Sequence, residues 1–386
     1  MDAHRLRARR PFGAPVVLLA AVAVLLAGCT SEQSTPGSPD EAPSATSATS
    51  APEPAEDASE EPTEESSEDP TDEPAEDPAE EPTEEPDPVD PISMAALARA
   101  DLTGGDLRLG TVRERTAAYT SYDVTFASTT AGRGTSPLRI SGVLNVPTGR
   151  GPFPAVVLAH GYIDPAVYVR GQGMTRERGF LAQRGYVALH VDYRNHAEST
   201  DDPRVETAVR LGYAGDTIAA LHALRKSREV RVDPDRIALF GRSMGGGVMM
   251  KALAAEPGLF AAGVGWASVS SLEAENFAQF QRPDAPLAEL KAGFRGRHGL
   301  PAEDPGFWRG VSPRPLFGEI TEPVLMVHGR FDDTCPPEWA RATQRAMTRA
   351  GVDATLEWYD DAHAFGPAFV AAMDRTVRFL DARMPA

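Results

Sequence analysis

The segment IALFGRSMGGGVMMKALAA, residues 237–255, decides the fold. Its first four residues are a short apolar run, which is typical of a strand buried on both faces, and its last eight residues favour a helix. Between the two stand Gly241, Ser243 and Gly245 in a G-x-S-x-G pattern. A serine on a sharp strand-to-helix turn needs glycine on either side, because only glycine lets the strand and the helix approach closely. The segment therefore predicts an outward-facing Ser243 hydroxyl, a candidate nucleophile.

Further apolar runs on both sides of this segment set the fold class. They lie at residues 155–159, 186–191, 262–266 and 324–327, with a weaker run at 354–359. The stretches between them have helical spacing, so the sequence predicts an α/β fold with a mainly parallel, doubly wound sheet covered by helices on both faces.

At the start of the predicted folded part, apolar residues alternate with polar ones instead of forming continuous runs. After a short helical lead-in at residues 94–100, apolar residues alternate over 122–126 and return at 138–146. Gly132 and Gly134 stand between these two runs as a turn. We therefore expect an antiparallel hairpin at one edge of the sheet.

A long connection precedes the penultimate predicted strand. Residues 268–322 hold about 55 residues with scattered aromatic side chains and prolines, which is too long for a simple crossover. We interpret this insertion as a lid or pocket wall over the carboxyl ends of the strands; the alternative is that its aromatic residues belong to the ordinary core. The aromatic residues in question are Trp266, Phe277, Phe280, Phe294 and Trp308.

A serine nucleophile needs a general base that a carboxylate orients, in the chain order serine, acid, histidine. The run at 324–327 leads into HGRFDDTCP, residues 328–336, which puts Asp332 and Asp333 in a loop at a strand end. We assign the acid to Asp332, with Asp333 as its main rival. His363 follows the last predicted strand and precedes a helix, so it is the candidate base. The other seven histidines precede the acid or lie outside a strand-end loop.

Two backbone N–H groups are candidates for stabilising an oxyanion. The Met244 N–H opens the predicted helix, where the helix dipole favours negative charge. The second is the N–H of Tyr162, in the loop after residues 155–159, where Gly161 permits close approach and His160 holds the loop. No histidine, aspartate or glutamate spacing indicates a metal, and the glycine run lacks the lysine of a phosphate loop, so we expect no cofactor.

These motifs together resemble the catalytic domain of the prolyl oligopeptidase family and, more loosely, dienelactone-hydrolase-like esterases. The resemblance covers about residues 120–380 and rests on residues 154–161, 191–194, 241–246, 312–313 and 323–336 together with His363. It implies the α/β-hydrolase fold and a serine hydrolase acting through an acyl-enzyme.

The resemblance leaves the substrate open. Family peptidases normally carry a large N-terminal β-propeller, whereas only about thirty folded residues precede the core here, so we expect a stand-alone hydrolase. It implies a serine peptidase acting on peptides, with a carboxylesterase acting on small esters as the alternative. A catalytically inactive wall-binding module is the remote alternative.

The first 29 residues are typical of an export signal. Four arginines between residues 5 and 10 precede an apolar run at 16–27, too short to span a bilayer comfortably. Leu26-Ala27-Gly28-Cys29 resembles the lipobox of bacterial lipoproteins, which implies that Cys29 is acylated. We therefore expect export across the cytoplasmic membrane and anchoring on its outer face, in the bacterial cell envelope. Residues 9–12 resemble part of a twin-arginine motif, so both export routes stay open.

Residues 30–92 form a predicted disordered tether. Between residues 31 and 90 there are 22 acidic side chains, no lysine or arginine, and no hydrophobic period. Such a segment cannot bury enough apolar surface to offset its ordering entropy. The net charge of −18 belongs to this tether, because the predicted hydrolase domain, residues 93–386, carries about +1. A near-neutral domain does not indicate a nucleic-acid partner. The oligomeric state is open.

Overall fold

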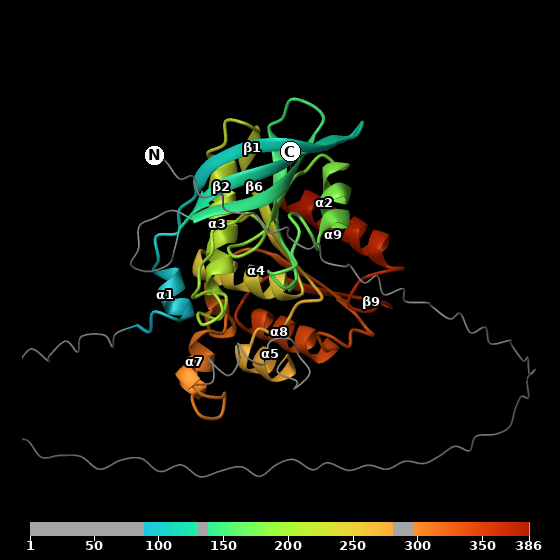
Figure 1. The fold of residues 1–386 in the computed structure, drawn as a ribbon. Helices are drawn as coiled ribbons and strands as arrows, with labels where there is room; N and C mark the ends of the chain where they lie inside the picture. Colours follow the sequence, from blue (N-terminus) through green and yellow to red (C-terminus); the bar gives the residue numbers. More distant parts are fainter. Residues whose placement is uncertain (1–88, 130–137, 281–295, 386) are drawn as a thin grey trace, which may run out of the picture. The chain divides into compact units, whose positions relative to one another are not determined.

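The computed structural model describes residues 89–129, 138–280 and 296–385 (Figure 1). The predicted signal with Cys29 lies outside these ranges, as do most of the tether, the glycine turn at 132–134 and Phe294. No helix within the described ranges is both long enough and apolar enough to cross a membrane.

A single nine-stranded sheet forms the centre of the fold, in the order β1-β2-β3-β5-β4-β6-β7-β8-β9. The strands from β5 to β9 run parallel to one another, whereas β1, β2 and β3 are antiparallel. The predicted mainly parallel sheet is confirmed. The strands are β1 Gly105–Arg115, β2 Tyr119–Ser128, β3 Leu138–Pro147, β4 Phe153–Ala159, β5 Val187–Val191, β6 Val232–Arg242, β7 Gly263–Trp266, β8 Val324–Gly329 and β9 Ala354–Tyr359.

The predicted hairpin is present as β2 and β3, but it does not lie at the edge of the sheet. The unpredicted strand β1 pairs with β2 and takes the edge position. Leu107 is the only fully buried residue of β1, and most of the others are exposed. A strand whose residues are mostly in water shows no apolar alternation, which is why the sequence did not reveal it.

Helices cover both faces of the sheet. They are α1 Met94–Ala98, α2 Thr175–Ala182, α3 Leu211–Arg225, α4 Met244–Ala255, α5 Glu273–Gln279, α7 Pro305–Gly310, α8 Pro337–Arg349 and α9 Phe369–Arg383, with a 3₁₀ turn η1 at Arg314–Glu319. Figure 1 shows α2 and α9 on one side of the sheet and α3 and α4 on the other.

Strand β4 shows why two helical layers are needed. Val157 packs into a core with α3 and α4, whereas its neighbours Val156 and Leu158 pack into a second core with α2 and α9. All three side chains are fully buried. Successive side chains of a strand point to opposite faces, so an uninterrupted apolar strand has to be covered on both. The doubly wound prediction is therefore confirmed.

The insertion at 268–322 contributes α5, α7 and η1. Phe277 on α5 and Trp308 on α7 are in ring contact, with centroids 4.4 Å apart. Trp266, by contrast, packs in the sheet core against Phe240 and Phe365 and is fully buried. Its assignment to a lid or pocket wall is therefore wrong, because its side chain faces the helical layer of α9.

Candidate active site

Ser243 lies on a strained turn between β6 and α4. Its backbone has φ +57° and ψ −121°, a conformation that a non-glycine residue adopts at a cost on the order of 1–3 kcal/mol. A Cβ atom on Gly241 would stand 2.0 Å from the Gly245 oxygen, and one on Gly245 would stand 1.8 Å from the Ala159 oxygen. Both glycines are therefore required for the turn. The Ser243 N–H donates to the Trp266 carbonyl at 2.9 Å, which fixes the turn against β7.

The structure brings Ser243, His363 and Asp332 together from three separate loops. His363 Nε2 lies 3.0 Å from Ser243 Oγ, and His363 Nδ1 lies 2.9 and 3.0 Å from the two Asp332 carboxylate oxygens. These loops follow β6, β8 and β9, whose carboxyl ends share one edge of the sheet. The geometry is that of a hydroxyl, a base and an orienting acid in one hydrogen-bonded row.

The acidic loop distinguishes Asp332 from Asp333. Asp332 is buried, and its Oδ1 also accepts backbone N–H groups from Thr334 at 3.0 Å and Cys335 at 2.8 Å. Asp333 is exposed, and its carboxylate accepts from the Thr334 hydroxyl at 3.3 Å. The loop therefore points the first of the two acids at His363 and the second at solvent.

Two arginines hold the loop that carries His363. Arg242, which precedes the serine, donates to the His363 carbonyl at 3.2 Å and pairs with the buried Glu177 at 3.4 Å. Arg176 donates to the Phe365 carbonyl at 3.1 Å. Sequence reasoning gave Arg242 no role, although its position between Gly241 and Ser243 was a signal.

Asp361 anchors the same loop from within. Its carboxylate accepts the N–H groups of Ala362 at 2.8 Å, Gly366 at 3.1 Å and Ala368 at 2.8 Å. Burial alone would raise the pKa of Asp361, but the three N–H donors outweigh it and hold the pKa below its ordinary value. The imidazole of His363 is thus carried by a loop whose backbone is hydrogen-bonded on both sides of it.

The predicted oxyanion donors line the same cavity as the reacting groups. Tyr162 and Met244 both border a cavity of about 420 Å³ together with Ser243 and His363. Met244 is the first residue of α4, so its N–H belongs to the positive end of a 12-residue helix. Tyr162 follows Gly161, where an added Cβ would stand only 3.1 Å from the Ser243 Cβ. The loop therefore passes directly beside the serine.

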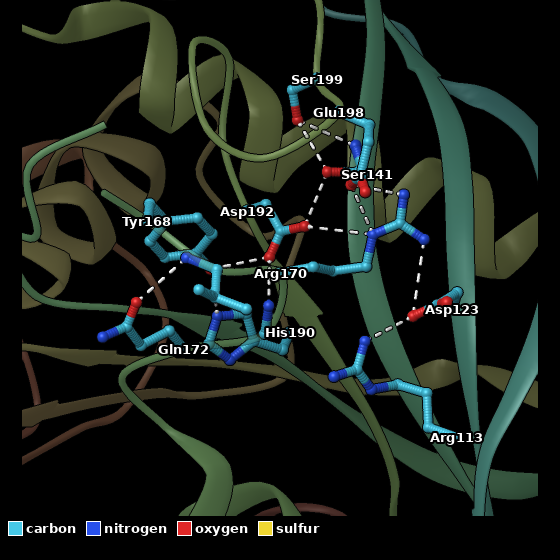
Figure 2. A network of polar contacts seen from close by, with 12 residues as sticks. Arg113, Asp123, Ser141, Tyr168, Arg170, Gln172, His190, Asp192, Glu198 and Ser199 are labelled. Carbon is cyan, nitrogen blue, oxygen red and sulfur yellow. Dashed lines mark hydrogen bonds and ion pairs between the residues drawn. The ribbon is translucent and has the colours of Figure 1, made fainter. Parts of the chain in front are cut away.

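A buried polar network lies behind the loop that contains Tyr162 (Figure 2). Asp192, at the end of β5, is fully buried and accepts from the Tyr168 hydroxyl at 2.7 Å, the Gly171 N–H at 2.8 Å and the Ser141 hydroxyl at 2.6 Å. The Tyr168 hydroxyl also lies 3.1 Å from His190 Nε2. The network ties the far end of the loop to β3 and β5.

Arg170 connects this network to the surface. Its guanidinium pairs with Glu198 at 2.6 Å and Asp123 at 3.5 Å, and Asp123 pairs in turn with Arg113 at 2.7 Å (Figure 2). Asp192 lies 4.0 Å from the Arg170 Nε. Even so, burial raises the pKa of Asp192 above its ordinary value, although its hydrogen bonds and Arg170 act in the opposite direction.

His160 and His190 stack within the network, with ring centroids 5.4 Å apart. Both rings are fully buried. Burial lowers the pKa of His160 from 6.5 to about 3, and burial also lowers that of His190 well below its ordinary value. The Nδ1–H of neutral His160 donates to the Gly161 carbonyl, 2.6 Å away, so His160 holds the loop as the sequence indicated.

Beyond the reacting groups, the cavity has apolar walls and two ion pairs. Phe277, Phe280 and Trp308 of the insertion line it, which places these three aromatic residues in the predicted pocket wall. One ion pair is Glu206 with Arg210, at 2.8 Å, and the other is Lys251 with Glu273, at 2.8 Å.

Sequence reasoning missed both ion pairs. Lys251 could nevertheless have been noticed in the sequence, because it is the single charged residue in the otherwise apolar, buried helix α4. Among the described residues, no group of three or more histidine, cysteine, aspartate or glutamate side chains converges on a common metal position.

Comparisons with known proteins agree with this geometry. The family model described as the prolyl oligopeptidase family matches residues 173–383. An uncharacterized peptidase, YuxL, of Bacillus subtilis is 25% identical over 219 residues, which cover 55% of this chain and 31% of that protein. The prolyl endopeptidase FAP of Mus musculus is 30% identical over 148 residues, which cover 36% of this chain and 17% of that protein. The chain thus spans less than a third of the length of these curated relatives.

Among solved structures, the fold is similar to that of acetyl xylan esterase 1 from Thermoanaerobacterium sp. JW/SL YS485. The TM-score is 0.57 at 20% identity, and the match covers 75% of this chain and 91% of that one. At this identity the likeness concerns the fold, which is that of an α/β-hydrolase.

Proposed function

Since the chain belongs to the prolyl oligopeptidase family, whose members are hydrolases, we propose that it is a serine hydrolase acting through an acyl-enzyme. The observation that carries the proposal is the hydrogen-bonded row of Ser243, His363 and Asp332, with Nε2 3.0 Å from Oγ and Nδ1 2.9 Å from the carboxylate. An inactive wall-binding module would have no need for this alignment on a strained turn.

Each residue of the site has a separate role in the reaction. Ser243 Oγ attacks the substrate carbonyl while His363 Nε2 takes its proton, and Asp332 holds Nδ1–H so that Nε2 is the basic nitrogen. The N–H groups of Met244 and Tyr162 stabilise the oxyanion of the tetrahedral intermediate. His363 then gives the proton to the departing amine or alcohol. Water, activated by the same imidazole, releases the acyl group and restores Ser243.

Peptides are the first proposed substrate class. The family supports a serine peptidase, and so do the two relatives described above, a peptidase and a prolyl endopeptidase. The cavity charges favour substrates without a charged amino end, because its two carboxylates, Glu206 and Glu273, are already paired with Arg210 and Lys251. A peptide cleaved internally or blocked at its amino end suits this arrangement better than one with a free amino end.

A carboxylesterase is the second candidate. The same neutral cavity, with apolar walls and a volume of about 420 Å³, suits the acyl group of a small ester. The acyl-enzyme mechanism serves esters as readily as amides, because both pass through the same tetrahedral intermediate and acyl-serine.

Turnover measurements separate the two candidates. The purified chain is tested with amino-blocked peptide anilides, unblocked peptide anilides and p-nitrophenyl esters of short acids, and kcat/KM is compared. We expect blocked anilides to exceed unblocked ones. If the esters are hydrolysed and none of the anilides is, the chain is a carboxylesterase. A higher kcat/KM for unblocked than for blocked anilides would contradict the proposed internal cleavage.

We also propose that the enzyme works outside the cytoplasmic membrane, on a lipid anchor at Cys29 with the acidic tether as spacer. The apolar run at 16–27 and the lipobox-like residues 26–29 support this location. Expressed in a bacterium fed an alkyne-labelled fatty acid, the wild type should carry the label and fractionate with membranes. A Cys29→Ser chain should do neither, and equal labelling of the two chains would refute the anchor.

A further inference from the structure

The cavity runs along one face of helix α4. Ser243 precedes the helix, and Gly247 and Lys251 follow at four-residue intervals, all three bordering the cavity. Residues four apart lie on one helix face, and eight residues at 1.5 Å each put Lys251 about 12 Å from Ser243 along the axis. A helical side chain leans toward the helix N-terminus, so the Lys251 stem leans back toward the serine.

Lys251 is a fixed, buried donor in a cavity whose only other ion pair among the described residues is Glu206 with Arg210. The residue is only 5% exposed, and its ammonium donates to Glu273 Oε1 at 2.8 Å and to the Val209 carbonyl at 3.1 Å. An ammonium has three N–H donors. Within the described residues these two acceptors account for two of them, and because Lys251 borders the cavity, the third is available to a group bound there.

The partner Glu273 is also held in place. Its second oxygen, Oε2, accepts from the amide nitrogen of Asn276 at 3.3 Å, and Asn276 is itself buried. The pair is therefore fixed from α4 and α5 at once. A buried pair of opposite charges has no net charge, so a third, unpaired charge entering beside it would lose its hydration without a partner.

Apolar surface separates this end from the reacting groups. Val248 and Val269 line the cavity, and Val269 lies beside Gly247, where an added Cβ would stand 2.7 Å from its Cγ2. The aromatic rings of Phe277 and Trp308 belong to the insertion and border the same cavity. A substrate group reaching from the serine to the lysine would therefore pass an apolar stretch before it meets the N–H donor.

We propose that this cavity is a subsite for an acyl group or side chain with an apolar body and a neutral hydrogen-bond acceptor, a hydroxyl or an amide, at its far end. The inference rests on the proposed function and adds the chemistry that the site selects. A plain alkyl end would displace water from the third Lys251 N–H without offering it a new hydrogen-bond acceptor. Sites that hydrogen-bond a substrate therefore discriminate against analogues that lack the acceptor.

The test uses four p-nitrophenyl esters: the acetate, hexanoate, ω-hydroxyhexanoate and the monoester of adipate. The acetate is too short to reach Lys251 and reports on the reacting groups alone. For the full chain, kcat/KM for ω-hydroxyhexanoate should exceed that for hexanoate by about tenfold or more, and adipate should be the poorest of the long esters. A preference for hexanoate or adipate would overturn the proposed subsite.

A matched variant removes the pair without leaving a buried charge. In the double variant Lys251→Met/Glu273→Gln, the glutamine still offers Asn276 an acceptor. The ratio of kcat/KM for ω-hydroxyhexanoate to that for hexanoate, both measured on the same variant, should fall to about unity or below. A preference that survives in the double variant would overturn the role of Lys251.

The two proposals fail in different ways. If the wild-type chain does not turn over even the acetate ester, the proposed function fails and this inference fails with it. If acetate is hydrolysed but the long esters show no preference, only the subsite fails. Should the double variant not fold, the four wild-type rates by themselves still decide the question.

Discussion

Two clusters of histidine and aspartate flank Ser243, and they differ in almost every property except composition. His363 with Asp332 lies on the cavity side, where Nε2 reaches the serine hydroxyl and the imidazole is 22% exposed. His160 and His190 with Asp192 lie behind the Tyr162 loop, where all three side chains are fully buried. His363 borders the cavity and can exchange a proton with a substrate there, whereas His160, His190 and Asp192 do not line that cavity.

The difference teaches that access and alignment, rather than residue type, separate a reacting cluster from a supporting one. In the supporting cluster His160 donates to the Gly161 carbonyl and Asp192 accepts from the Tyr168 hydroxyl, so the contacts are directed at the loop. Burial there lowers the histidine pKa values far enough to keep the rings neutral. We therefore expect changes in one cluster to abolish chemistry and changes in the other to weaken folding.

The largest effect should come from the base. His363→Ala removes the group that takes the serine proton, and kcat should fall on the order of a millionfold. Folding should be preserved, because the ring is partly exposed and its loop is anchored by Asp361 and Arg242. Single-turnover kinetics and urea unfolding check both statements. A residual rate within tenfold of wild type would assign the chemistry to the other cluster.

The acid should give the next largest effect. Asp332→Asn leaves the shape of the side chain intact but no longer holds the tautomer with a basic Nε2, so kcat should fall about ten thousandfold. The exposed neighbour provides the matched control, since Asp333→Asn changes an equally charged side chain that does not contact His363. A larger loss from Asp333→Asn than from Asp332→Asn would reverse the assignment.

A change in the supporting cluster should act mainly on stability. Asp192→Asn replaces one carboxylate oxygen by an NH₂ group, which faces either the Tyr168 and Gly171 donors at Oδ1 or the Ser141 donor at Oδ2. The lost acceptor should lower the free energy of unfolding by about 1–3 kcal/mol. Asp374→Asn, at an exposed ion pair with Arg184, is the control and should cost less than about 1 kcal/mol. Equal midpoints for the two variants in urea would contradict the supporting role.

The supporting cluster should also make stability depend on pH. The pKa of His160 is lowered by burial from 6.5 to about 3, so between these values the unfolded chain binds a proton that the folded chain excludes. The corresponding stability is fully present above about pH 6.5 and is lost as the pH falls toward 3.

The matched measurement compares wild type with His160→Asn. The slope of unfolding free energy against pH between 4 and 6 should be less steep in the variant by about 1.4 kcal/mol per pH unit, the value for one proton. Identical slopes would show that the buried ring does titrate in the folded state.

The apolar runs and the Gly241 to Gly245 turn allowed most of the sheet and the serine to be predicted, because burial on both faces and close packing restrict residue type locally. β1 could not be predicted, since its residues are largely exposed. The choice between Asp332 and Asp333 depends on how one loop meets another, and adjacent identical residues carry no local signal for it.

The pocket wall was the least predictable part of the site. Lys251 and Glu273 meet only because α5 of the insertion packs against α4, and Glu206 and Arg210 are brought in by the segment before α3. The Lys251–Glu273 pairing is a property of the tertiary structure, whereas Glu206 and Arg210 are four residues apart and only their position at the cavity depends on the fold. The reacting groups therefore follow from local motifs, whereas the groups that line the rest of the cavity depend on how distant segments pack together.

Covalent trapping tests whether Ser243 is the nucleophile that the His363 and Asp332 cluster activates. The purified chain is incubated with a fluorophosphonate, and intact-mass and peptide mass spectrometry locate the adduct. We predict one phosphonyl group per chain on the peptide that contains Ser243, and none on a folded Ser243→Ala chain. An adduct on another residue, or a folded wild-type chain that takes up no label, would contradict the account.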